Sequence, residues 1–374
     1  MKRNYLIVAC FFLIVAAGCV SYMITPDKKF SPDENRYLTE RPKCTAKALL
    51  SGEYTEKMDS YATDQFALRT KAITLKTQVS KLAGVKDGNG VYFGKDDTLM
   101  LKKTPQEFSQ QKYENNLFAV SAFAKRNEKI PFYVMLAPTA SYIWKDKLPS
   151  KAVDYDQREK LDQAAAYFKD DENITLVDPS QELLQHKGED LYYRTDHHWT
   201  EKGAYYAYRS LQEAMGRKPK EYKADKVTDS FYGTLYSKVL PFGMKPDTIE
   251  AYRPGSKVEV SHSNGKKVTD SIFDEDKLKV KDKYQYFLGG NDDEVTIKTG
   301  NKNGQHLLIV KDSYANSFLP FLVDDYETIH MVDLRYFNGN MTMYMKTKKI
   351  NKVLVLYNLN NFDEDTSIVK VQMP

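Results

Sequence analysis

The sequence predicts an α/β fold built on a doubly wound, mostly parallel sheet. Short apolar runs without polar alternation are typical of strands that are buried on both faces. Five such runs occur, at residues 131–138, 174–178, 307–310, 329–334 and 353–357. Helix-like stretches at 105–127, at 155–169 and after Thr200 alternate with them. This alternation predicts parallel strands with helices on both faces of the sheet.

The N-terminus predicts a membrane anchor. Lys2 and Arg3 precede an apolar stretch over residues 5–24, which is long enough to span a bilayer and suits an uncleaved anchor better than the short apolar region of a cleaved signal. The positive flank places the rest of the chain outside the cytoplasm. An alternative is lipidation at Cys19, since Ala16–Cys19 resembles a lipoprotein cleavage box. Either way the sequence predicts attachment to a cell membrane.

The remaining chain divides by composition. Residues 25–45 carry three prolines and many charges, which favours a stalk or an extended wrap. We expect the α/β domain to span 46–374, with a helical pattern around 46–82 and a glycine-rich hairpin over 88–99. Residues 217–299 break the helix–strand rhythm with short β-like pieces, so they are expected to form a β-rich insertion beside the active site.

The overall charge argues against nucleic acid as a partner. The net charge of +4 comes from 55 basic and 51 acidic residues that alternate along the chain, whereas nucleic-acid binding proteins gather basic residues on one face. The chain has 27 Tyr and 18 Phe but only 2 Trp. Tyrosine suits sugar binding, yet it is also common in the half-buried core of a large domain, and composition does not separate these alternatives.

The run Asp196-His197-His198-Trp199 is the strongest candidate for chemistry. In an extended segment Asp196 and His198 face the same way, so the carboxylate can orient the imidazole while His197 points elsewhere. Ser313 follows the apolar run 307–310 and precedes a helix-like segment, as an activated nucleophile would. These three residues predict a Ser-His-Asp arrangement.

Other interpretations of the same residues remain open. Ser313 is also a suitable helix N-cap. Asp196, His197 and His198 could ligate a metal, although adjacent histidines usually point apart and the other four histidines show no metal-binding spacing. A structural histidine pair at the end of a strand is a further alternative.

Several short motifs resemble those of the DHHW family and, through it, of the SGNH-hydrolase-like proteins that O-acetylate alginate and other exported polysaccharides. The motifs are the DHHW run itself, Glu34-Asn35-Arg36, Asp64-Gln65-Phe66 with Arg69, the 90–95 hairpin, Gly289-Gly290-Asn291, Lys311 to Asn316, and Asp333-Leu334-Arg335-Tyr336. The resemblance covers nearly the whole chain beyond the apolar segment.

The resemblance implies Ser313 as nucleophile, His198 as base and Asp196 as its orienting acid. It also implies that Asn291 donates to the oxyanion, with Lys311 standing where SGNH hydrolases have glycine. Tyr314, Asn316 and Arg335 are further oxyanion or substrate candidates. Neither a cofactor nor a metal is implied. The histidine precedes the serine by 115 positions (313 − 198), so the motif order is permuted relative to ordinary SGNH hydrolases.

The function that follows is extracytoplasmic O-acetyl transfer to a cell-surface or exported polysaccharide. Because acetyl-CoA is cytoplasmic, the resemblance implies a membrane-bound O-acyltransferase partner that delivers acetyl groups across the bilayer. An esterase that removes such acetyl groups is the nearest alternative, since water and a sugar hydroxyl attack alike. A non-catalytic envelope scaffold is the alternative from another class.

Overall fold

The chain folds into two units. The computed structural model describes residues 2–372, without the side chains of residues 2–4, 6, 7, 10, 14, 17, 19, 21, 23 and 264. One unit comprises Met1–Val85 with Tyr236–Met244, and the other comprises Lys86–Leu235 with Lys245–Pro374. The large sheet belongs to the second of these units.

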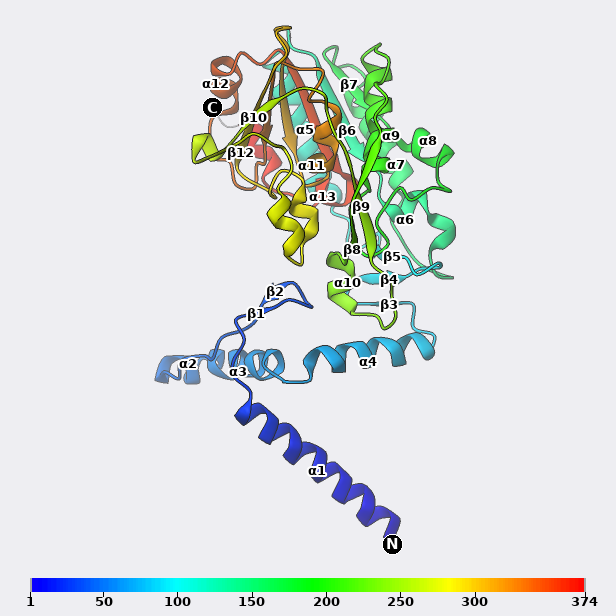
Figure 1. The fold of residues 1–374 in the computed structure, drawn as a ribbon, viewed down its shortest axis with the longest axis vertical. Helices are drawn as coiled ribbons and strands as arrows, with labels where there is room; N and C mark the ends of the chain where they lie inside the picture. Colours follow the sequence, from blue (N-terminus) through cyan, green and yellow to red (C-terminus); the bar gives the residue numbers. More distant parts are fainter. Residues whose placement is uncertain (1, 373–374) are drawn as a thin grey trace. The chain divides into compact units, whose positions relative to one another are not determined.

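The first unit is mainly helical. Its elements are α1 (Lys2–Ile24), β1 (Phe30–Ser31), β2 (Arg36–Tyr37), α2 (Ala46–Leu50), α3 (Glu53–Asp64) and α4 (Arg69–Leu82) (Figure 1). The helical pattern predicted around 46–82 forms three helices, since the chain leaves the helical conformation twice. Gly52 adopts a left-handed φ of 77° between α2 and α3, a conformation that glycine tolerates best. The second break, at Gln65–Leu68, is fixed by the Gln65 amide, which bonds the backbone of Lys28.

The predicted stalk is a folded segment of this unit. Strands β1 and β2 pair as a short hairpin, and the Arg36 guanidinium binds both carboxylate oxygens of Asp64 in α3. Residues 25–45 thus wrap onto the helices that follow them. Within the described part of the chain, no helix has the length and apolar character that crossing a membrane requires. The anchor stays a prediction, and the Cys19 side chain, on which the lipidation alternative depends, lies outside the described residues.

The second unit contains a large, mostly parallel sheet. Its strand order is β11-β10-β12-β14-β13-β15-β6-β7. The five parallel strands coincide with the five predicted runs: β6 (Phe132–Ala137), β7 (Ile174–Val177), β13 (His306–Lys311), β14 (Thr328–Val332) and β15 (Lys352–Asn358). The mixed α/β class and the mostly parallel sheet are therefore confirmed.

Residues 217–299, the expected β-rich insertion, contribute three strands to one edge of the large sheet. Strands β10 (Val258–His262), β11 (Lys267–Thr269) and β12 (Glu294–Thr299) extend it in antiparallel fashion. Two further strands, β8 (Ala224–Phe231) and β9 (Asp247–Tyr252), pair with each other. Short antiparallel strands with polar residues lack the continuous apolar pattern of buried parallel strands, which is why composition alone set this region apart.

Helices cover both faces of the sheet (Figure 1). Leu307 and Ile309 of β13 lie in one apolar core, and the alternate residues Leu308 and Val310 lie in the other, as the two-residue period of a strand requires. The first core includes residues of α6 (Ala140–Ile143), α8 (Ser180–Gln185), α9 (Glu201–Ala214) and α11 (Tyr314–Phe318). The second includes residues of α5 (Gln110–Lys125), α7 (Gln157–Phe168), α12 (Met341–Thr347) and α13 (Leu359–Phe362).

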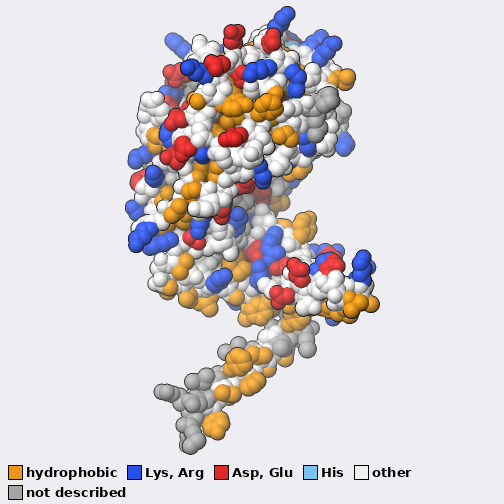
Figure 2. Space-filling view, turned by 180° about the vertical axis from the view of Figure 1, so that it is seen from behind, with side chains coloured by type: hydrophobic (Ala, Val, Ile, Leu, Met, Phe, Trp, Pro, Cys, Tyr) orange, Lys and Arg blue, Asp and Glu red, His pale blue; other side chains and the backbone are white. Residues whose placement is uncertain are grey.

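The predicted 88–99 hairpin is a three-stranded sheet of β3 (Asp87–Gly88), β4 (Val91–Phe93) and β5 (Leu99–Leu101). Over the face of the α/β unit that Figure 2 presents, basic and acidic side chains are interspersed. This surface agrees with the even charge balance along the sequence.

Candidate active site

The candidate site lies where the parallel strands end. Asp312 and Ser313 directly follow β13, Asp333 follows β14, and Asn358 ends β15. Because the carboxyl ends of parallel strands share one edge of a sheet, these side chains gather there, as ligand sites of open α/β sheets do. The DHHW loop enters the same place from the turn that precedes α9.

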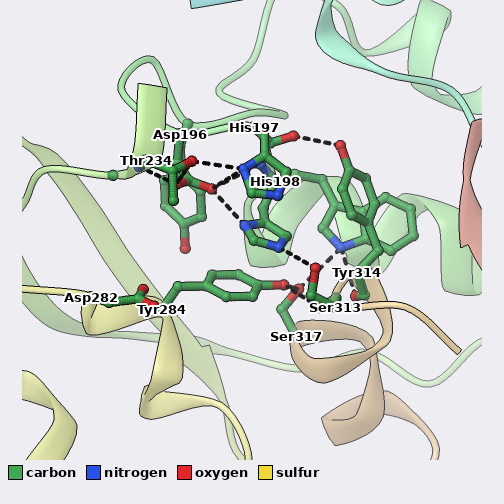
Figure 3. Close-up of polar contacts among 12 residues, drawn as sticks. Asp196, His197, His198, Thr234, Asp282, Tyr284, Ser313, Tyr314 and Ser317 are labelled. Atoms are coloured by element: carbon green, nitrogen blue, oxygen red, sulfur yellow. Dashed lines mark hydrogen bonds and ion pairs between the residues drawn. The ribbon is translucent and has the colours of Figure 1, made fainter. Parts of the chain in front are cut away.

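Asp196, His198 and Ser313 form one hydrogen-bonded chain (Figure 3). The His198 Nδ1 lies 2.5 Å from Asp196 Oδ1, and its Nε2 lies 2.7 Å from the Ser313 hydroxyl oxygen. All three residues are buried, with 2%, 5% and 9% of their surfaces exposed. The structure thus brings together the three side chains that the sequence singled out, in the geometry of a Ser-His-Asp triad.

Asp196 is held as a carboxylate by four donors. Its Oδ1 accepts from the His198 ring and backbone N–H, and its Oδ2 accepts from the backbone N–H and hydroxyl of Thr234. Burial alone would raise the pKa of Asp196, but the imidazoles of His197 and His198 and these hydrogen bonds lower it well below its usual range. Asp196 is therefore negatively charged at neutral pH.

Both faces of the His198 imidazole are covered. The Tyr284 ring stacks on it at 3.7 Å between centroids with 11° between planes, and the His197 ring lies at 3.9 Å and 37°. Figure 3 shows Tyr284 lying beneath the imidazole. His198 is therefore fixed by its two nitrogens and by both faces of its ring.

The Trp199 side chain is fully buried. Its indole N–H donates to the Tyr314 carbonyl and to the Ser317 hydroxyl. The Tyr284 hydroxyl bonds Ser317 and also donates to the carbonyl of Ser313. These contacts tie the DHHW loop to the turn that carries Ser313.

Ser313 occupies the N-cap position of α11 but does not cap the helix with its side chain. The Asp312 carboxylate does so instead, accepting from the Tyr314 N–H at 2.9 Å. The Ser313 hydroxyl is thereby left to His198. Among the described residues the Ser313 N–H has no hydrogen-bond acceptor, so it is available to a developing oxyanion.

Lys311 is buried beside the serine, with 1% of its side chain exposed. Its ammonium donates to the amide oxygens of Asn291 and Asn316, at 2.9 and 2.8 Å. Burial lowers the pKa of Lys311 to about 8, and the nearby Asp333 opposes this shift. Lys311 and Asn316 both donate to the Asn291 oxygen, and among the described residues the Asn291 NH₂ group donates no hydrogen bond.

The remaining candidates lie around this centre. The Tyr314 hydroxyl donates to the His197 carbonyl, so it positions the DHHW loop. Arg335 makes a two-pronged ion pair with the buried Asp333, which raises the pKa of Arg335. Asp333 lies 4.0 Å from the Lys311 ammonium. Arg335 is therefore linked to the serine turn through Asp333 and Lys311.

The metal interpretation uses Asp196, His197 and His198, whose ligand atoms lie within 4.8 Å of one another. However, both Asp196 oxygens accept two hydrogen bonds each, and both His198 nitrogens have protein partners. The His197 Nδ1 lies 2.8 Å from the Thr234 hydroxyl. A metal would have to break these contacts, so the arrangement fits a proton-transfer chain better than a ligand set.

Thr234 and Tyr284 were not predicted from the sequence. Both lie in the 217–299 stretch, which we expected to lie beside the active site. The run Phe231-Tyr232-Gly233-Thr234 has no periodic signal, and only the glycine hints at a close approach. The pairing of these residues with the DHHW loop depends on contacts over about 40 and 90 positions, which local patterns do not encode.

Comparison with known proteins finds the family that the motifs resemble. The sequence profile of the DHHW protein family matches residues 106–332. A crystal structure of a DHHW family protein from Eubacterium siraeum is similar with a TM-score of 0.65 and 26% identity, covering 76% of this chain and 96% of that one.

Two structures of Bacillus cereus PatB1 are also similar. The one with a sulfonyl adduct has a TM-score of 0.61 and 21% identity, covering 76% of this chain and 98% of that one. The other has a TM-score of 0.58 and 20% identity, covering 73% and 97%. At these identities they establish a shared fold. No curated protein matches the sequence.

Proposed function

The chain belongs to the DHHW family, and we propose that it moves acetyl groups through Ser313 to hydroxyls of a cell-surface or exported polysaccharide. The observation that carries this proposal is the position of His198, whose two nitrogens bond Asp196 and Ser313. An imidazole oriented by a carboxylate is the group that a serine needs to become a nucleophile.

The first step transfers the acetyl group from its donor to the serine. The Ser313 oxygen attacks the acetyl carbonyl carbon while its proton passes to His198 Nε2. The tetrahedral intermediate then collapses, the bond to the leaving group breaks, and His198 returns the proton to that group. The negatively charged Asp196 stabilises the imidazolium that exists between these events.

The oxyanion of this intermediate needs donors that are aimed at it in advance. The Ser313 N–H is one candidate, since it has no acceptor among the described residues. The Asn291 NH₂ group is the second candidate, because Lys311 and Asn316 hold its oxygen and turn the NH₂ group away from themselves. Each such donor contributes about 10²- to 10³-fold to the rate in comparable sites.

The second step passes the acetyl group to the acceptor. A sugar hydroxyl gives its proton to His198 Nε2 and attacks the acyl carbon, and the Ser313 oxygen leaves and takes that proton back. The burial of Asp196, His198 and Ser313 supports transfer over hydrolysis, since it limits the access of water to the acyl-enzyme.

The setting of the reaction belongs to the same proposal. The domain lies on the extracytoplasmic side of a cell membrane, held by its N-terminus, and a membrane-bound O-acyltransferase supplies acetyl groups. In this interpretation the site is an SGNH-like one with its motif order permuted, since Asp196 and His198 precede Ser313 in the chain.

The test is an acyl-transfer assay on the purified full chain. With 4-nitrophenyl acetate as donor, we expect release of nitrophenolate and acetylation of an added oligosaccharide, and loss of both in Ser313→Ala. Ser180→Ala is the matched control, because Ser180 is also buried and its hydroxyl has no partner in the described structure.

The outcomes separate the alternatives. Equal rates for the wild type and Ser313→Ala would refute the enzymatic proposal and favour a scaffold. Release of acetate by the wild type with every oligosaccharide tried, without sugar acetylation, would favour the esterase.

A further inference from the structure

Thr234 controls half of the hydrogen bonds that the Asp196 carboxylate accepts. A carboxylate offers about four lone-pair sites, and here all four are used. The His198 backbone and ring occupy Oδ1, while the Thr234 backbone N–H and hydroxyl reach Oδ2 at 2.7 and 2.9 Å. Thr234 is the first residue of α10 (Thr234–Val239) and lies far from the DHHW run in sequence.

The donor and the acceptor of each hydrogen bond in this cluster follow from which groups carry a proton. An ionised carboxylate only accepts, so the single hydroxyl proton of Thr234 points to Asp196. The oxygen of that hydroxyl must then accept from His197 Nδ1, which lies 2.8 Å away. His197 therefore carries a proton on Nδ1, and it supports Asp196 through Thr234.

The backbone before Thr234 passes very close to the Asp196 side chain. A Cβ atom on Gly233 would lie 2.3 Å from the Asp196 Cβ and 2.4 Å from its Oδ2, so no side chain fits at position 233. The Gly233 N–H also donates to the Thr195 hydroxyl, which in turn donates to Asp247. The 233–234 turn is thus fixed against the loop that carries Asp196.

We propose that Thr234 is a positioning residue that orients the Asp196 carboxylate toward His198 and limits how strongly Asp196 holds the imidazole proton. This inference rests on the proposed function of the site. Donors on Oδ2 stabilise the negative charge of Asp196 and so weaken its pull on the His198 Nδ1 proton. Without the Thr234 hydroxyl, Asp196 holds that proton more strongly, and the imidazolium becomes more stable.

Other charged and titratable groups face the pair as well. They come from the DHHW loop, from the turn after β13 and from the 282–284 segment, and they are His197, Tyr314, Tyr284 and Asp282. Burial raises the pKa of Asp282, which lies near both Asp196 and His198. These groups are the same in every variant below, so a shift between variants reports on position 234.

The experiment compares Thr234→Val with Thr234→Ser in the full chain. Valine keeps the shape and removes the hydroxyl, whereas serine keeps the hydroxyl and removes the methyl group. The rate of Ser313 acylation by 4-nitrophenyl acetate is followed from pH 5 to 9, and the titration of the histidine side chains is followed by NMR with ¹⁵N-labelled histidine.

For Thr234→Val we expect acylation at the high-pH plateau to fall about 10- to 100-fold, as for the loss of a hydrogen bond to a charged group. The half-maximal pH of acylation and the NMR midpoint of His198 should both move upward by about one unit. Thr234→Ser should stay within about threefold of the wild type, with unchanged midpoints.

A loss of folded structure moves no titration midpoint in the molecules that remain folded, so the shift distinguishes positioning from stability. An unchanged His198 midpoint in Thr234→Val would overturn the inference, and so would a serine variant that behaves like the valine variant. If the wild type forms no acyl-serine, the proposed function fails. The NMR titration of His198 still tests the role of Thr234 in that case.

Discussion

Two clusters of motif residues with opposite surroundings show how the same charged side chains serve different ends. In the first unit, Glu34, Arg36, Asp64 and Arg69 form an ion-pair cluster in which Arg36 remains 39% exposed. In the second unit, Lys311 and Asp333 are almost fully buried. The arginine lowers the pKa of Asp64 below its usual range, whereas burial moves Lys311 toward its neutral form.

This difference in burial suggests different roles, with the first cluster stabilising the fold and the second supporting the reaction. The arginines of the first cluster stay partly hydrated, although Glu34 and Asp64 are only 9% exposed, so breaking one of these pairs changes local packing and stability. Burying a charge lowers the free energy of unfolding, so buried charges are found mainly where they have a functional role. We therefore expect changes at the strand ends to alter acyl transfer, and changes in the first unit to alter stability alone.

The largest expected effect comes from removing His198, the general base of the proposed mechanism. His198→Ala removes the group that takes the serine proton, so the rate of Ser313 acylation should fall by about 10⁶-fold, as in other serine triads. His306→Ala is the control, since His306 bonds Thr328 at the opposite end of β13. Similar losses in the two variants, measured with 4-nitrophenyl acetate, would show that His198 has no special role.

Asp196→Asn should have the next largest effect, about 10⁴-fold on the same rate. The amide keeps the shape of the carboxylate but presents an NH₂ group or a neutral oxygen to His198, which disturbs its tautomer. Thermal unfolding measured alongside should show a folded variant. Full activity of Asp196→Asn would contradict the role of the acid.

Lys311 gives the comparison a pH-dependent test. The unfolded chain keeps its Lys311 proton to about pH 10.5 and the folded chain to about pH 8. Between these values the unfolded state binds more protons, so Lys311 makes the free energy of unfolding rise with pH, by up to about 3 kcal/mol. Below pH 8 the full cost of the buried charge is present.

Lys311→Met should lack this rise. Urea unfolding of the wild type and the variant from pH 7 to 10 measures the difference, with the exposed Lys302→Met as control. A constant difference between wild type and Lys311→Met across this range would mean that Lys311 does not change its protonation as the burial argument requires.

The smallest effect is expected in the first unit. Arg36→Ala removes the pair with Asp64 and should lower the free energy of unfolding by about 1 kcal/mol, less at high salt. The acylation rate should stay that of the wild type. A rate loss greater than tenfold with unchanged stability would show that the two clusters are not separate in function.

Much of the fold could be predicted because buried parallel strands leave a continuous apolar signature, as in 307–310 and 353–357. The triad residues could be predicted because the two-residue period of an extended loop places Asp196 and His198 on one side, and because Ser313 follows a strand. The antiparallel edge strands, Thr234 and Tyr284 could not, since their roles arise from contacts between distant segments. The helix breaks at Gly52 and Gln65 were missed because helical periodicity continues across them.

The most direct test of the central claim is to trap the acyl-enzyme. The full chain is mixed with 4-nitrophenyl acetate, quenched in acid and digested, and the site of acetylation is located by mass spectrometry. We predict one acetyl group on Ser313, absent from Ser313→Ala and discharged when an acceptor oligosaccharide is added before the quench. An active protein in which acetyl never appears on Ser313, or in which Ser313→Ala retains full activity, would contradict the proposed serine acyl-transfer mechanism.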